Sequence, residues 1–150
     1  MKRILFAATL IVALASCKKE EAPDQVMINS INITDFPMTN DAGGSWDASD
    51  DADLYIAVAE SNVIVWTAPS YFENATNTTE YLFTPSSAIP FLTLTNECQI
   101  DFYDWEDGTS DEWMGGVEFT FEDFKEEAKE TLSLTSGTFT MTLNLEWGNQ

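Results

Sequence analysis

Acidic side chains gather in two short segments of this 150-residue chain, residues 41–53 and residues 104–112. The first holds four Asp between positions 47 and 53, and the second places five Asp or Glu around Gly108. Carboxylates held close together repel one another unless a cation lies between them. Oxygen ligands without imidazole or thiolate select a hard cation, and flexible loops with several carboxylates suit Ca²⁺ better than Mg²⁺. If the fold brings both segments to one end, the sequence predicts a calcium site there.

A second interpretation is that both segments are merely solvated turns. Asp and Gly are common turn residues, so composition alone favours this view. The spacing of the acidic residues favours the metal site instead. Residues 104–115 do not form an EF-hand loop, because the alternating ligand positions and the flanking helices of that motif are missing.

Composition excludes several other classes of function. Six Lys and Arg stand against 26 Asp and Glu, a formal charge of -20, so no basic patch is available for a nucleic-acid partner. The chain has no His, which removes Ser-His-Asp and Cys-His catalytic arrangements and His-ligated zinc. Its two cysteines, Cys17 and Cys98, allow no zinc ribbon or disulfide framework.

The N-terminus resembles the precursor of a bacterial lipoprotein. Lys2 and Arg3 precede a short apolar run that ends in Leu-Ala-Ser-Cys17, as in a lipobox, where the Cys becomes the lipidated N-terminus. We therefore expect a signal peptide over residues 1–16 and a lipidated tether over residues 17–25. The alternative is an ordinary secretory signal cut near Ser16. The Lys-Lys-Glu-Glu sequence after Cys17 also resembles the export tags of Bacteroidetes surface lipoproteins.

Residues 26–150 read as one mostly β domain. Apolar and polar side chains alternate along residues 138–147 without a break, and shorter stretches repeat the pattern, which is typical of half-buried antiparallel strands. The expected strands are 26–34, 54–58, 63–67, 81–84, 89–95, 98–102, 117–121 and 138–147. Residues 123–132 place Phe124, Ala128 and Leu132 at spacing four, which predicts one short helix. The sequence thus predicts an all-β, eight-stranded antiparallel Greek-key sandwich with one short helix near 123–132.

The acidic pattern resembles the C2 domain family of calcium-dependent binding modules. Asp47 and Asp53 have the family's six-residue spacing before a strand, here Leu54-Tyr55-Ile56. The family's other calcium loop has Asp at a strand end and acidic residues two and eight positions later. Here these positions hold Asp104, Glu106 and Glu112, with Asp111 beside the last.

The resemblance implies a C2-like sandwich in which Ca²⁺ lies between loops 41–53 and 104–112. Glu replaces Asp at two of the matched positions, and Leu54 replaces the usual Pro, so the metal geometry departs from the family pattern. The implied side-chain ligands are Asp47, Asp53, Asp104, Glu106 and either Asp111 or Glu112. Main-chain carbonyls would come from Trp46 and Trp105. Trp113 would be an anchoring core aromatic.

These observations predict a non-enzymatic calcium-binding module, anchored to the bacterial outer membrane through the lipid on Cys17, with a protein or glycan partner. The alternative is a calcium-independent β-sandwich that serves as a ligand-binding or structural accessory lipoprotein. A glycosidase using two carboxylates is disfavoured, because a small sandwich leaves little room for a substrate cleft. Anionic phospholipid is also disfavoured as a partner, because the domain is strongly negative and lacks a basic patch.

Overall fold

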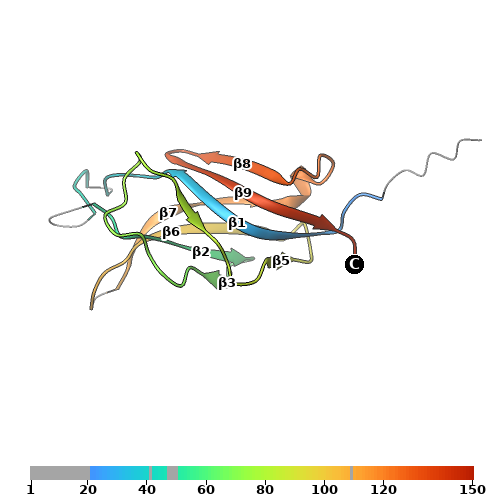
Figure 1. The fold of residues 1–150 in the computed structure, drawn as a ribbon, viewed down its shortest axis with the longest axis horizontal. Helices are drawn as coiled ribbons and strands as arrows, with labels where there is room; N and C mark the ends of the chain where they lie inside the picture. Colours follow the sequence, from blue (N-terminus) through green and yellow to red (C-terminus); the bar gives the residue numbers. More distant parts are fainter. Residues whose placement is uncertain (1–20, 41, 47–50, 109) are drawn as a thin grey trace, which may run out of the picture.

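The computed structural model describes residues 21–40, 42–46, 51–108 and 110–150. Within them, the strands form two antiparallel sheets that face each other as a β-sandwich (Figure 1). The expected signal peptide over residues 1–16, Cys17 and the first part of the tether lie outside the described residues. In the described part, no helix is long and apolar enough to cross a membrane.

The first sheet has the strand order β4-β1-β9-β8, with β5 also paired to β1. Its strands are β1 (Gln25–Asp35), β4 (Tyr81–Phe83), β5 (Ile89–Phe91), β8 (Thr131–Ser136) and β9 (Phe139–Gly148). Both β4 and β5 lie along the edge of β1 that β9 leaves open, β4 opposite residues 31–33 and β5 opposite residues 26–28. They are two pieces of one interrupted edge strand, so the nine described strands fill eight strand positions.

The second sheet has the order β3-β2-β6-β7. Its strands are β2 (Leu54–Glu60), β3 (Val63–Thr67), β6 (Glu97–Asp104) and β7 (Glu112–Thr120). After β2 and β3 in this sheet, the chain returns to place β4 beside β1, which is the Greek-key connection expected from the sequence. The register aligns Tyr55, Tyr103 and Trp113 across β2, β6 and β7.

Alternate side chains of both sheets fill the space between them. In β1 the fully buried apolar residues are Val26, Ile28, Ile31 and Ile33, and in β6 they are Cys98, Ile100 and Phe102. The alternation predicted this, because side chains two residues apart share one face of a strand. Burial also raises the pKa of the Cys98 thiol, so the thiolate form that a nucleophile needs is disfavoured.

The predicted helix over residues 123–132 is wrong. The structure has a 3₁₀ turn, η1 (Phe121–Phe124), and then a strand, β8, that begins at Thr131. The backbone of Ala128 adopts a positive φ of 40°, which a continuing helix excludes. Leu132 and Leu134 alternate with Ser and Thr and face the core, so the period of two prevails over the spacing of four that Leu132 shares with Phe124.

The directions of the strands determine at which of the two ends of the sandwich each connection lies. At one end of the sandwich lie the last residues of β1, β3 and β6 and the first residues of β2 and β7. We call this the acidic end. It carries the described parts of the connections 36–53, 68–80 and 105–111, and the short turn between β8 and β9. The opposite end carries η1, residues 125–130, and the start of β1, where Gln25 pairs with Gly148 at the end of β9 (Figure 1).

Candidate functional site

The fold brings two of the predicted ligand positions together, Asp53 and Asp104. Asp104 is the last residue of β6 and pairs with Leu54, the residue after Asp53. The backbone N–H of Asp53 donates a hydrogen bond to Asp104 Oδ1 at 2.7 Å, and the N–H of Trp105 donates to the Asp53 carbonyl at 2.9 Å. These two bonds fix the two acidic residues side by side, although 51 positions separate them in the chain.

The burial of Asp104 sets it apart from a solvated turn residue. It is 0% exposed, and its register places its side chain on the same face as Leu54, toward the inside of the sandwich. A buried carboxylate is costly unless hydrogen bonds or a cation stabilise its charge. Asp53 is only half-buried, and its Oδ1 accepts a bond from the N–H of Asn74 in the connection 68–80. The pair therefore ties the connections 36–53, 68–80 and 105–111 together.

Asp111 lies on the other face of the sheet. Its Oδ2 accepts a hydrogen bond from the Tyr55 hydroxyl at 2.6 Å, and its Oδ1 accepts one from the Glu106 N–H at 3.2 Å. Tyr55 points away from the core, because it alternates with the fully buried Leu54 and Ile56. Asp111 thus holds the 105–111 connection on the outward face of the sheet, whereas Asp104 faces the inside of the sandwich.

Glu112 is the better placed of the two residues proposed for the last ligand position. It is exposed and stands opposite Asp104 in the register of β6 and β7, so the two side chains share a face. Glu106 is half-buried, and its backbone is held by Asp111. Among the residues that the structure describes, no group of three or more His, Cys, Asp or Glu is arranged to hold a metal ion. Asp47 lies outside the described residues.

Two of the predicted tryptophans occupy different surroundings at this end. The indole N–H of Trp46 donates to the Pro37 carbonyl at 2.7 Å, so this side chain folds back over the base of its loop. Trp105 stacks on Tyr71, with ring centroids 4.4 Å apart and planes 7° from parallel. The expectation that Trp113 is a core aromatic is wrong. It is 59% exposed, because it aligns with the outward-facing Tyr103 after a bulge in the register.

Sequence reasoning missed a groove on the outward face of the acidic end. It has a volume of about 420 Å³ and is lined by the segment 67–71 and by Tyr55, Trp105 and Asp111. The stacked Tyr71–Trp105 pair forms one wall, and Tyr55, itself stacked on Tyr103, forms part of another. Tyr71 has no regular spacing to the other aromatics in the sequence, so only the folded structure could reveal this wall.

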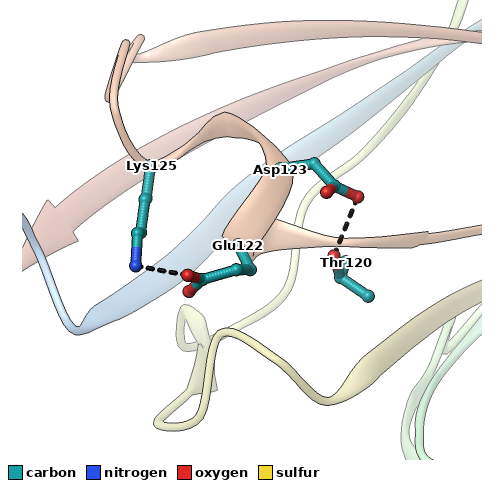
Figure 2. A network of polar contacts seen from close by, with 4 residues as sticks. All are labelled: Thr120, Glu122, Asp123 and Lys125. Carbon is teal, nitrogen blue, oxygen red and sulfur yellow. Dashed lines mark hydrogen bonds and ion pairs between the residues drawn. The ribbon is translucent and has the colours of Figure 1, made fainter.

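Negative charge surrounds the groove. Desolvation and then the carboxylates of Glu73, Asp53 and Asp107 raise the pKa of Tyr71. Desolvation and then Asp111 likewise raise the pKa of Tyr55. The two lysines of the described residues lie at the opposite end, where Lys125 pairs with Glu122 and Lys129 with Glu127. Figure 2 shows the first of these pairs beside the hydrogen bond from Thr120 to Asp123.

Comparison with protein families identifies one match. Residues 1–17 match the model of the prokaryotic membrane lipoprotein lipid attachment site, which supports the predicted lipid anchor at Cys17. No curated protein matches the sequence.

Comparison with solved structures finds C2 domains. A structure described as a C2 domain has 12% identity and a TM-score of 0.53 over 81% of this chain and 94% of that chain. A single C2 domain of plant Extended Synaptotagmin 1 has 13% identity and a TM-score of 0.51 over 87% and 98%. Human GIVD cytosolic phospholipase A2, in complex with an inhibitor and terbium chloride, has 17% identity and a TM-score of 0.55 over 87% of this chain and 18% of that chain.

The coverage of the larger neighbours is partial. This chain spans 48% of a two-domain chain of Extended-Synaptotagmin 2 and less than a fifth of the phospholipase. At such low identities the likeness concerns the fold alone. The chain therefore combines a lipoprotein attachment signature with a C2-like β-sandwich.

Proposed function

We propose that this protein is a non-catalytic binding module, anchored to the bacterial outer membrane by the lipid on Cys17, in which Ca²⁺ binds at the acidic end. The observation that carries the proposal is the pairing of Asp53 with the buried Asp104. Asp53 lies in the connection before β2 and Asp104 ends β6, and both occupy positions that the resemblance to C2 domains assigns to calcium ligands. Bound Ca²⁺ would offset the negative charge of the carboxylates at this end, since the described lysines lie at the opposite end.

The donor chemistry fits Ca²⁺, while the described carboxylates alone do not complete a site. Calcium takes six to eight oxygen ligands. Asp53 and Asp104 supply carboxylates, Glu112 stands on the same face, and Trp46 and Trp105 are the proposed sources of main-chain oxygens. Asp47 and Glu106 complete the proposed set. Asp111 is the weaker candidate, because its carboxylate is already held by Tyr55 and by the Glu106 backbone.

Two structural neighbours support this proposal by analogy. One is described as the pair of C2 domains of Extended-Synaptotagmin 2 with calcium bound, at 18% identity and a TM-score of 0.50 over 85% of this chain and 46% of that chain. The other is the phospholipase structure that contains terbium chloride. The partner of the present protein would be a protein or a glycan. An anionic phospholipid surface would be repelled by the net charge of -20.

The proposal of a non-catalytic role is supported by the chemistry of the side chains. The chain has no His, and its one described thiol, Cys98, is buried in a strand. Asp104, Asp53 and Asp111 each accept hydrogen bonds that hold the backbone of the loops. These bonds suit a role in shaping a binding end.

Thermal unfolding of the lipoprotein in nonionic detergent tests the calcium proposal. The midpoint is measured in EDTA, in millimolar Ca²⁺ and in millimolar Mg²⁺. Ligand that binds only the folded state raises the midpoint by mass action. We expect a rise with Ca²⁺ that is much larger than with Mg²⁺, lost in Asp53→Asn and Asp104→Asn. The exposed Glu97→Gln, at the opposite end, serves as the matched control and should keep the full rise.

A second candidate function is a calcium-independent ligand-binding or accessory lipoprotein. It is favoured by one observation: the carboxylates of Asp53, Asp104 and Asp111 already accept hydrogen bonds within the chain. An equal midpoint in EDTA and Ca²⁺ would overturn the calcium proposal and leave this alternative.

A further inference from the structure

We propose that the groove lined by segment 67–71 and by Tyr55, Trp105 and Asp111 binds an arginine or lysine side chain of a protein partner. The groove is separate from the Asp53–Asp104 pair, because Tyr55 and Asp111 line it on the outward face of the second sheet. The inference therefore does not rest on calcium binding.

The walls of the groove suit a cation. A guanidinium or ammonium group is attracted to the face of Trp or Tyr, and Arg stacks on such rings in parallel. Tyr71 and Trp105 present two rings that already lie within 7° of parallel, so a planar guanidinium can extend the same stack. The volume of about 420 Å³ is sufficient for one long side chain and its neighbours.

The charges around the groove point to the same occupant. Asp111 lines it directly, and the charges of Glu73, Asp53 and Asp107 act on Tyr71. Both described lysines lie at the other end of the sandwich, in pairs with acidic residues. A cationic side chain from a partner would supply the charge that the described part of this chain does not bring to the groove. A neutral glycan could stack on the rings but would leave these carboxylates uncompensated.

The inference is tested by calorimetric titration of the lipoprotein, in nonionic detergent with EDTA, with a blocked tetra-arginine peptide. Neutral maltohexaose is the competing probe. We expect saturable binding of the peptide that weakens at higher salt, because surface charges are screened. The variants Tyr71→Leu and Trp105→Leu should each weaken it by about fivefold or more, in keeping with cation–π interactions. Asp111→Asn should weaken it less.

Two control variants separate the groove from general acidity. Trp113→Leu removes an exposed Trp outside the groove, and Glu97→Gln removes a carboxylate at the opposite end. Both should bind the peptide as the unchanged protein does. The inference is overturned if the peptide does not bind, if Tyr71→Leu and Trp105→Leu bind it with unchanged affinity, or if maltohexaose binds through Tyr71 and the peptide does not. Because Tyr71 lies on a surface connection, its variant keeps the test valid if Trp105→Leu does not fold.

Discussion

The two ends of the sandwich use their carboxylates in different ways. At the acidic end, Asp104 and Asp53 accept hydrogen bonds from backbone N–H groups and hold three connections together. At the opposite end, Glu122 pairs with Lys125 (Figure 2) and Glu127 pairs with Lys129, both on the surface of a single connection. Acidic side chains are present at both ends, but the described lysines are present at only one. A cation required at the acidic end must therefore come from outside the described chain.

The comparison predicts that the largest loss of stability comes from the buried carboxylate. Replacing Asp104 with Ala leaves the Asp53 N–H without its acceptor, and we expect a loss of about 2 kcal/mol in the free energy of unfolding. The measurement is urea denaturation in EDTA. Glu122→Ala is the matched change at the other end. Equal losses for the two variants would contradict the distinction between the ends.

The link between two connections of the acidic end should have the next largest effect. Asn77 exchanges two hydrogen bonds with the backbone of Phe36, at 3.1 and 2.8 Å. Asn77→Ala should cost about 1–2 kcal/mol, since both backbone groups lose their partner. Asn96→Ala removes one bond to the Glu60 side chain at the opposite end and should cost less. The denaturation midpoints of both variants check this order.

Alkaline pH should weaken the acidic end. Burial and Asp111 raise the pKa of Tyr55 above its ordinary value of 10.0, so the folded state keeps a proton that the unfolded state loses. Stability is therefore lost as pH rises above the ordinary tyrosine pKa. Tyr55→Phe should flatten the fall of the thermal midpoint between about pH 9 and pH 11. An equally steep fall in the variant would show that other groups cause it.

The smallest effect should come from the surface ion pair. Lys125 and Glu122 are both partly exposed, so Lys125→Ala should change the free energy of unfolding by less than about 1 kcal/mol. Added salt should have little effect on the free energy of unfolding of the Lys125→Ala variant. A loss as large as that of Asp104→Ala would mean that the opposite end depends on its ion pairs as much as the acidic end depends on its buried carboxylate.

The sequence predicted the features that depend on local pattern. The residues that alternate along 138–147 form β9. Cys98, Ile100 and Phe102, which the alternation places on one face, lie on the core side of β6. The two acidic segments were expected at one end, and Asp53 does meet Asp104. The helix prediction for residues 123–132 was wrong because Leu132 fits the spacing of four of a helix as well as the spacing of two of a strand. The strand pairing with β9 decides between them.

Three other features, which depend on contacts between distant segments or on a local irregularity of a strand, could not be predicted. Tyr71 meets Trp105 only because the connections after β3 and β6 lie at the same end. Trp113 turns outward because of a bulge beside Tyr103, which the alternation of residues does not reveal. Asp111 was grouped with the inward ligands, but its bond to Tyr55 places it on the opposite face.

Calorimetric titration of the lipoprotein with Ca²⁺ tests most directly whether the acidic end binds this cation. We predict saturable binding that is lost in Asp53→Asn and Asp104→Asn and kept in Glu122→Gln, because only the first two residues form the inward pair. Mg²⁺ should bind much more weakly. Equal heats for the three variants and the unchanged protein, or no binding of Ca²⁺ at all, would contradict the calcium site.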